Sequence, residues 1–139
     1  MIFGIGTDIV EVARIEKILS KEHGFREKVF TPGEINYCNS KKNPAESYAA
    51  RFAAKEAFFK ALGTGWAGEM QFTEIEIISG NRGEPIIALH GNVHTITEAH
   101  GIDNVYVSLS HTTLFATAII LLEKCSNGLP PRINFTRTR

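Results

Sequence analysis

A long helical pattern over residues 45–62 constrains the fold of this chain more than any other segment. Pro44 precedes the pattern, as is common in the first turn of a helix, and Gly63-Thr64-Gly65 ends it. Ala, Glu, Lys and Phe dominate the segment, and its apolar side is wide. A helix with a wide apolar side needs a broad apolar surface to cover it, so we expect it to lie against a β-sheet.

Strand patterns that could supply this sheet occur at residues 2–7, 72–79, 85–90, 105–110 and 114–123. The second and third flank a turn sequence, Gly80-Asn81-Arg82-Gly83, which predicts a hairpin. The last two flank His111-Thr112-Thr113 and predict another. Shorter helices are expected at residues 11–22, from Thr31-Pro32-Gly33-Glu34 through Cys38, and at 93–99. Because strands and helices are segregated, the predicted class is α+β: an antiparallel sheet packed against one long helix with shorter helices.

Composition limits the kind of protein this can be. The chain has 139 residues, of which 43% are hydrophobic, a size and composition that predict one globular domain. Fifteen basic and fifteen acidic residues cancel, which disfavours general nucleic-acid binding. We expect no secretion leader and no membrane span, and reduced thiols at Cys38 and Cys125, hence a cytoplasmic protein. We expect one domain over residues 1–124 and an extension over 125–139 that is flexible or docked.

Two acidic residues stand out as candidate metal ligands. Asp8 follows the glycine-rich first strand, and Glu56 lies in the middle of the long helix among residues that look buried. The simpler interpretation of Glu56 is an ion pair with Lys60 one turn later, and that of Asp8 is a cap. Together, however, they offer two hard oxygen ligands of the kind that Mg²⁺ prefers. Positive charge for a phosphorylated ligand could come from Arg51, Lys55, Lys60 and His111.

Other chemical patterns are weaker. Gly4 and Gly6 lack the third glycine of a dinucleotide-binding fingerprint, and no Gly-x-Ser-x-Gly elbow supports serine hydrolysis. A concentrated basic surface comprises Arg14, Lys17 and Lys21, continued by Arg26 and Lys28. Most such faces are simply solvated, and the alternative is a docking site for an acidic partner.

Four ordered motifs resemble the holo-[acyl-carrier-protein] synthases, the small bacterial phosphopantetheinyl transferases. They are Gly4-Ile5-Gly6-Thr7-Asp8-Ile9-Val10-Glu11, Arg51-Phe52-Ala53-Ala54-Lys55-Glu56-Ala57 with Lys60, Gly63-Thr64-Gly65, and Val107-Ser108-Leu109-Ser110-His111-Thr112. The resemblance covers residues 1 to 124. It implies transfer of phosphopantetheine from coenzyme A to a serine of apo-acyl carrier protein, with release of adenosine 3',5'-bisphosphate, in support of fatty acid biosynthesis.

The resemblance also implies roles for individual residues. Asp8 and Glu56 match the family's magnesium ligands, Lys60 and His111 are assigned to the phosphates, and Arg51 to the nucleotide end. Gly63, Thr64 and Gly65 are assigned to the wall of the cleft. The proton of the serine could go to a metal-bound water or to Glu56. The family further implies a homotrimer with active sites between subunits, and a docking surface for the carrier protein formed by Arg14, Lys17, Lys21, Phe25, Arg26 and Lys28.

Two other functions remain open on the residues alone. One is a non-catalytic module that binds a phosphorylated ligand without turning it over. The other is an Mg²⁺-dependent phosphohydrolase. Both would use the same carboxylates and basic residues, so the fate of coenzyme A separates them from a transferase.

Overall fold

The computed structural model describes residues 1–21, 23–64, 68–125 and 136–137 of the chain. Within these ranges the elements follow the order β1 (Ile2–Glu11), α1 (Val12–Lys21), α2 (Phe25–Val29), α3 (Pro32–Asn39), α4 (Pro44–Leu62), the 3-10 helix η1 (Phe72–Glu74), β2 (Ile75–Ser79), β3 (Pro85–Leu89), α5 (Gly91–Ala99), β4 (Asn104–His111), β5 (Phe115–Glu123) and β6 (Thr136–Arg137). The predicted α+β class and both predicted hairpins are confirmed.

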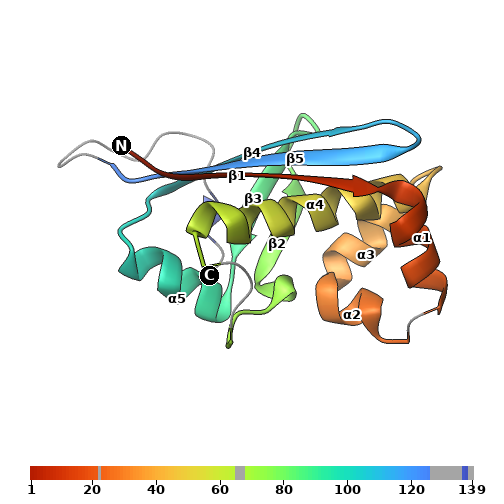
Figure 1. The fold of residues 1–139 in the computed structure, drawn as a ribbon, viewed down its shortest axis with the longest axis horizontal. Coiled ribbons are helices and arrows are strands. Elements are labelled where there is room, and N and C mark those ends of the chain that lie inside the picture. The colour runs from red at the N-terminus through yellow and green to blue at the C-terminus, as the bar shows by residue number, and fades with distance from the viewer. Residues whose placement is uncertain (22, 65–67, 126–135, 138–139) are drawn as a thin grey trace.

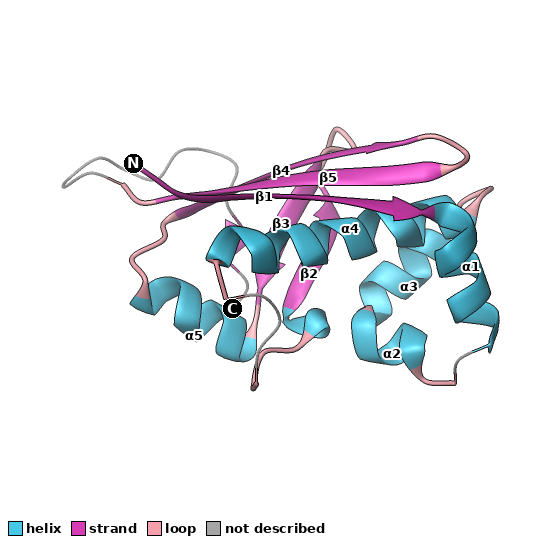
Figure 2. Ribbon diagram, in the orientation of Figure 1, coloured by secondary structure: helices cyan, strands magenta, loops and turns pink. Residues whose placement is uncertain are grey.

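The strands form two sheets where the sequence predicted one. β1, β5 and β4 make an antiparallel sheet in that spatial order, and β2, β3 and β6 make a second. The β3–β6 pairing is parallel, through Ala88 with Thr136 and Leu89 with Arg137. Figure 2 shows the β2–β3 hairpin crossing behind α4 rather than continuing the first sheet. A strand pattern identifies strands, but it does not say which of them pair.

Helix α4 lies along one face of the β1-β5-β4 sheet, as predicted, and Figure 1 shows α1, α2 and α3 gathered at one end of it. Gly4 and Gly6 explain how closely the helix approaches. A Cβ atom at Gly4 would lie 1.9 Å from the carbonyl oxygen of Ala61, and one at Gly6 would lie 2.0 Å from that of Ala57. These two glycines therefore serve helix packing, since any side chain there would push α4 away from β1.

The opposite face of this sheet exposes four large apolar side chains among polar ones. Side chains alternate along β1, so Ile5 and Ile9 point away from α4 and are 62% and 64% exposed. On the neighbouring strand β5, Phe115 and Ile119 belong to the same face and are also exposed. A β-sheet face of this composition is typical of a surface that contacts another molecule.

Two local predictions were wrong, and one helix was not predicted. β1 extends to Glu11, because β5 pairs with it along its whole length, so Asp8 lies inside the strand opposite Ala118 rather than at its end. Residues 72–74 form η1 instead of strand, because the Glu74 side chain accepts a hydrogen bond from the Gln71 amide at 2.9 Å and stabilises a turn. Nothing in the sequence pattern indicated α2.

Among the described residues, no helix has the length and apolarity needed to cross a membrane.

Candidate active site

Asp8 faces helix α4. It follows Gly4 and Gly6 at period two on the helix-facing side of β1, where the strand and the helix lie close together. The ammonium of Lys60 donates to Oδ1 of Asp8 at 2.9 Å and to the Thr7 carbonyl at 3.1 Å. The Lys60 side chain is 54% exposed and that of Asp8 is 16% exposed. This pair therefore stands at the rim of the molecule, within reach of a ligand.

Glu56 lies beside Asp8. Partial burial is the main cause that raises the pKa of the Glu56 carboxyl above its ordinary value, and the negative charge of Asp8 raises it further. Lys60 and Arg14 act in the opposite direction. The simpler interpretation of Glu56, an ion pair with Lys60, is not what the structure contains, because Lys60 forms its ion pair with Asp8. Two neighbouring carboxylates thus lie near Lys60 and Arg14, and Lys60 pairs directly with Asp8.

This carboxylate pair fits a magnesium ion. Burial and the charge of Asp8 disfavour the ionised form of Glu56, which a bound cation would favour, and the ligand atoms are the hard oxygens that Mg²⁺ prefers. Within the described ranges, no group of three or more His, Cys, Asp or Glu side chains is placed to enclose an ion. An open pair of this kind suits Mg²⁺, which usually takes one or two carboxylates and completes its shell with water and substrate phosphates.

Arg51 and His111 line a separate cavity of about 210 Å³. Tyr37 lies in the same cavity, with the Arg51 guanidinium 3.9 Å from the centroid of its ring and the Lys41 ammonium 4.6 Å from it. A hydrogen bond with Ser79 is the main cause that lowers the pKa of the Tyr37 hydroxyl, and the charges of Arg51 and Lys41 add to it, although burial opposes them. The cavity therefore joins cationic and aromatic side chains, which suits a phosphorylated nucleotide.

Sequence reasoning missed Tyr37 and Lys41. Tyr37 lies on α3 and Lys41 in the loop that follows it, whereas Arg51 is on α4, so no spacing in the sequence links the three. The hydrophobic pattern of α3 could have indicated only that Tyr37 is partly buried. Tertiary packing brings the group together, and only the structure can show it.

The two groups of predicted site residues lie on different sides of one chain. None of Asp8, Glu56 and Lys60 lines the cavity of Arg51 and His111. His111 pairs with Ala116 on β5, and Ala116 pairs in turn with Val10 on β1, so one strand separates His111 from the strand of Asp8. The Nδ1 atom of His111 lies 3.7 Å from Oε1 of Glu46, at the start of α4. A ligand that touches all five predicted residues would have to reach around this chain or join two copies of it.

Lys55 does not face a ligand, contrary to its predicted role as a source of positive charge. Its side chain is 0% exposed and forms an ion pair of 2.7 Å with the equally buried Glu34. Burial is the main cause that lowers the pKa of Lys55, and the carboxylate of Glu34 opposes this shift. Lys55 differs from Lys60 because it lies on the side of α4 that faces α3 and η1.

The glycine-rich segment after α4 is described only in part. Gly63 has a φ of 84° and ends the helix, and its amide donates to the carbonyls of Phe59 and Lys60. That amide is therefore engaged in the helix cap and is not free for a phosphate. Thr64 is exposed, and Gly65 lies outside the described residues.

The residues of the predicted docking surface differ in exposure. Arg14, Lys17 and Lys21 are exposed along α1, and so is Lys28. Phe25 is half-buried, with its ring centroid 6.1 Å from that of Phe52. Arg26 is half-buried as well, and its guanidinium lies 5.5 Å from the centroid of the Tyr48 ring.

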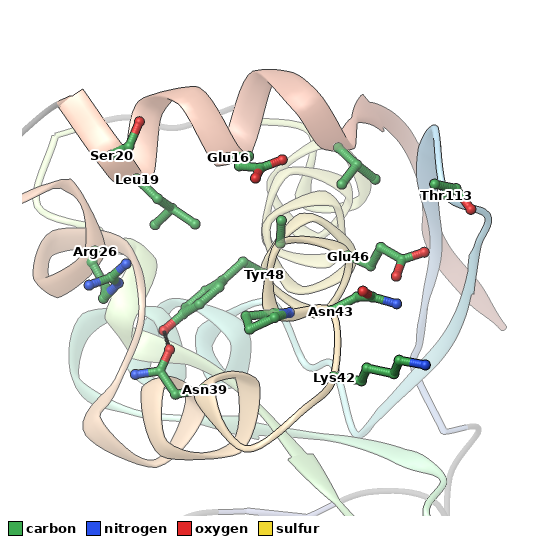
Figure 3. Close-up of a pocket in the computed structure, with 13 residues that line it drawn as sticks. Glu16, Leu19, Ser20, Arg26, Asn39, Lys42, Asn43, Glu46, Tyr48 and Thr113 are labelled. Atoms are coloured by element: carbon green, nitrogen blue, oxygen red, sulfur yellow. Dashed lines mark hydrogen bonds between the residues drawn. The ribbon is translucent and has the colours of Figure 1, made fainter.

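Figure 3 shows a larger cavity, of about 620 Å³, between α1 and the beginning of α4. Glu16 and Leu19 line it from α1, and Glu46 and Tyr48 line it from α4. Of the predicted site residues, Arg26 alone belongs to this lining. Volume therefore does not locate the carboxylate pair, which lies at an open edge of the molecule and not in this cavity.

Comparisons with known proteins agree with this fold and identify its family. The family model described as "4'-phosphopantetheinyl transferase superfamily" matches residues 4–116. A holo-[acyl-carrier-protein] synthase of Halothermothrix orenii is 46% identical over 125 residues, which cover 89% of this chain and 99% of that protein.

Solved structures give the same result. The holo-[acyl-carrier-protein] synthase from Neisseria meningitidis is 36% identical, with a TM-score of 0.82 over 89% of this chain and 100% of that chain. The synthase from Bacillus anthracis, solved in complex with CoA (3',5'-ADP), is 40% identical, with a TM-score of 0.75 over 90% and 99% of the two chains.

The fold and these matches define a small α+β transferase. The chain belongs to the 4'-phosphopantetheinyl transferase superfamily. The predicted resemblance is thereby confirmed, and the glycine and carboxylate motifs that carried it lie within the matched residues.

Proposed function

We propose that this transferase moves the phosphopantetheine arm of coenzyme A to a serine of apo-acyl carrier protein, releases adenosine 3',5'-bisphosphate, and so supports fatty acid biosynthesis. The observation that carries the proposal is the cluster of Asp8, Glu56 and Lys60 at the β1–α4 contact, in a chain whose relatives are holo-[acyl-carrier-protein] synthases. The structure of one such relative contains CoA (3',5'-ADP), which supports coenzyme A as the donor.

Asp8 and Glu56 would hold a magnesium ion. The ion supplies charge neutralisation and Lewis acidity at the pyrophosphate of coenzyme A. Lys60, which already contacts Asp8, lies where its ammonium can bind a phosphate oxygen and stabilise the charge that develops during transfer. Its 54% exposure leaves it free to turn toward a ligand.

The reaction needs one proton transfer and one displacement. The serine oxygen of the carrier attacks the phosphorus that bears the pantetheine arm, and the bond from this phosphorus to the bridging oxygen breaks. The bridging oxygen leaves as part of adenosine 3',5'-bisphosphate. The proton of the serine goes to water or to Glu56, whose raised pKa suits a group that accepts a proton.

Arg51 would bind the nucleotide end of coenzyme A, and His111, which lines the same cavity, would bind its phosphates. Tyr37 also lines this cavity, and the Lys41 ammonium lies 4.6 Å from the centroid of the Tyr37 ring, so the charges and the aromatic ring suit a phosphorylated adenosine. Because Asp8 and Glu56 do not line this cavity, we propose that the two groups that bind one coenzyme A come from different copies of the chain.

A homotrimer with its active sites between subunits resolves this separation. In such an assembly the cavity of Arg51 and His111 on one chain meets the Asp8 and Glu56 pair of the next. The exposed apolar face formed by Ile5, Ile9, Phe115 and Ile119 supports it, because this face needs a cover and a second copy of the same sheet provides one.

The carrier protein docks on the surface of Arg14, Lys17, Lys21, Phe25, Arg26 and Lys28. Its basic residues complement an acidic partner, and Arg14 is near enough to Glu56 to lower the pKa of that carboxyl, which places the beginning of this surface beside the reacting groups. Cys38 and Cys125 are unpaired thiols, which agrees with a cytoplasmic enzyme.

Mass spectrometry of the carrier protein tests the function. The full chain is incubated with coenzyme A, Mg²⁺ and apo-acyl carrier protein, and the carrier is expected to gain one phosphopantetheine. Coenzyme A that binds but stays intact would identify a binding module, and phosphate released without any carrier would identify a phosphohydrolase. Chelation of divalent ions is expected to stop the transfer, and transfer that continues in a chelator would remove the metal assignment.

Mixing inactive variants tests the sites between subunits. Asp8→Asn and His111→Ala damage different halves of the site, so trimers assembled from a mixture of both chains contain some interfaces with two intact halves. Activity is expected to return after the two variants are unfolded and refolded together. A mixture of Asp8→Asn with Glu56→Gln, which damage the same half, is the control and should stay inactive. Equal results for the two mixtures would contradict the interfacial site.

A further inference from the structure

We propose that Lys55 and Glu34 are positioning residues of the transfer reaction, which hold the docking segment 25–29 against the helix that carries Glu56. The inference rests on the proposed docking surface and extends it to two residues that touch neither substrate. The contacts of Lys55 carry it.

All three donors of the Lys55 ammonium are used inside the protein. Lys55 donates to Oε1 of Glu34 at 2.7 Å, to the carbonyl of Val29 at 2.7 Å and to the carbonyl of Phe72 at 3.0 Å. An ammonium has three N–H groups, so none remains for a ligand. Val29 is the last residue of α2 and Phe72 the first of η1, and one lysine of α4 therefore ties both segments to the long helix.

Both carboxylate oxygens of Glu34 also accept hydrogen bonds inside the protein. Its Oε1 atom accepts from the Thr31 amide at 2.9 Å, which closes the capping box of α3, and its Oε2 atom accepts from the Ile77 amide of β2 at 2.9 Å. A buried charge pair is stable only when such partners complete its shell. The pair fixes the position of α3 and β2 relative to α4 in the same way that Lys55 fixes α2.

Helix α2 needs tertiary contacts such as the hydrogen bond from Lys55 to Val29. It has five residues, and Gly24 before it makes no side-chain cap. A helix this short is not stable on its own, so tertiary contacts decide where it lies. α2 contacts α4 through the Val29 carbonyl on Lys55 and the ring of Phe25 near that of Phe52, both within one turn of Glu56. A third contact, the Arg26 guanidinium near the Tyr48 ring, lies further toward the start of α4.

The position of α2 matters for the reaction because Phe25, Arg26 and Lys28 belong to the docking surface. A docked carrier presents its serine correctly only if this surface keeps a fixed place relative to Glu56. Loss of the tie should therefore weaken productive docking of the carrier. It should leave the binding of coenzyme A nearly unchanged, because Arg51 and His111 lie in a different cavity.

A double variant separates this role from folding. Lys55→Met alone leaves the Glu34 carboxylate buried without a cation and can prevent folding. Lys55→Met combined with Glu34→Gln removes both charges, retains an amide oxygen for the Thr31 or Ile77 amide, and still lacks the ties to Val29 and Phe72. The kinetics of the full chain with coenzyme A, Mg²⁺ and apo-acyl carrier protein are measured together with amide exchange of residues 25–30.

The double variant is expected to raise the KM for the carrier at least about fivefold and to change that for coenzyme A less than about twofold. Exchange of the 25–30 amides is expected to accelerate about tenfold. Val93→Ala is the control, since Val93 is fully buried in α5 and its loss lowers stability without touching α2. It should lower the thermal midpoint but leave the KM for the carrier unchanged.

Two outcomes overturn the inference. If the double variant and Val93→Ala give the same KM for the carrier and the same exchange at residues 25–30, the ion pair only stabilises the fold. If Lys28→Ala leaves the KM for the carrier unchanged, the docking surface is misassigned, and the inference fails with it. Absence of transfer by the unmodified chain would instead refute the proposed function itself, so the failures are distinguishable.

Discussion

Helix α4 carries two lysine–carboxylate pairs that have the same chemistry and opposite surroundings. Lys55 and Glu34 are 2.7 Å apart and fully buried, whereas Lys60 and Asp8 are 2.9 Å apart and reach solvent. Distance alone does not distinguish them. The buried pair has its hydrogen-bonding capacity filled by the chain itself, and the exposed pair stands beside a second carboxylate, Glu56.

The difference shows which charges a protein can use for function. Water and a mobile side chain let Lys60 exchange Asp8 for a phosphate at little cost, because an exposed ion pair contributes only about 0–1 kcal/mol. Breaking the buried pair would strand a charge inside the protein. We therefore propose that the exposed Lys60–Asp8 pair, the open pair, belongs to the transfer site. The buried Lys55–Glu34 pair, the closed pair, holds the surrounding elements together.

Removal of the second carboxylate should give the largest effect on the open side. Glu56→Gln keeps the size of the side chain but removes its charge, and we expect kcat/KM for transfer to fall by about three orders of magnitude. Folding should not suffer, because burial and Asp8 already disfavour the ionised carboxyl. Transfer assays and thermal unfolding check the two parts. Glu98→Gln, on the surface of α5, is the matched control, and an active Glu56→Gln would contradict the metal-ligand assignment.

Sequence reasoning anticipated the surroundings of the open pair, Lys60–Asp8, better than those of the closed pair, Lys55–Glu34. Asp8 and Glu56 could be singled out because each is an acid in an apolar setting, and the glycine spacing of β1 accompanied them. The partner of Lys60 could not be predicted, because Asp8 lies 52 residues away in the chain and meets Lys60 only through the β1–α4 contact. Helical spacing pointed to Glu56 instead.

The prediction that Lys55 supplies charge to a ligand was wrong for a physical reason. Lys55 precedes Glu56 in a charged motif, so it looked like a ligand-binding residue, but consecutive helix positions point about 100° apart. Its partner Glu34 was read only as part of a helix start. Both roles coexist in Glu34, which caps α3 and neutralises Lys55, and no local pattern reveals the second. Strand patterns likewise gave the hairpins but not the division into two sheets.

The next-largest effect should be a difference in the free energy of unfolding between variants of Lys55 and Lys60. Lys55→Met is expected to lower the free energy of unfolding by about 3–5 kcal/mol, because the Glu34 carboxylate stays buried without its cation. Lys60→Met should change the same quantity by less than about 1 kcal/mol while it reduces transfer activity. Urea unfolding followed by circular dichroism measures both. Similar losses for the two variants would refute the contrast between the closed and open pairs.

Cysteine labelling tests whether the core around Lys55 and Glu34 excludes solvent. Cys38 is fully buried, and burial is the main cause that raises the pKa of its thiol to about 11, with Glu34 adding to the shift. Since thiol reagents need an accessible thiolate, Cys38 should react at pH 8 only when the structure opens. We expect the double change Lys55→Met and Glu34→Gln to raise the labelling rate about tenfold, and Lys60→Met to leave it unchanged.

Cys125→Ser provides the background for this measurement, because Cys125 is only half-buried and would otherwise dominate the signal. The raised pKa of Cys38 also determines the direction in which its contribution to stability changes with pH. The folded state retains its thiol proton where the unfolded chain has lost it, so this group's contribution to stability falls as the pH rises from about 8.5 toward 11. Rapid labelling of Cys38 in the otherwise unchanged chain would contradict the closed packing around Glu34.

Metal binding should give the smallest change in stability, and it tests the Asp8–Glu56 carboxylate pair directly. A raised pKa means that ionised Glu56 opposes folding, so its contribution to stability declines as the pH rises from about 4.3 through the pKa that it has in the folded chain. A divalent ion relieves this opposition because it binds the ionised form. At ten times its Kd, Mg²⁺ should stabilise the fold by about 1.4 kcal/mol and raise the thermal midpoint by about 5 °C at pH 7.

The gain should shrink at pH 5, where protons compete with the ion for Glu56, and it should vanish in Glu56→Gln at either pH. Lys60→Met offers the opposite control. Without its ammonium, Asp8 loses its partner and the pair becomes more negative, so Mg²⁺ should raise the midpoint of this variant more than that of the unchanged chain. An equal rise in all three chains would place the ion elsewhere on the surface and leave the carboxylate pair without a metal.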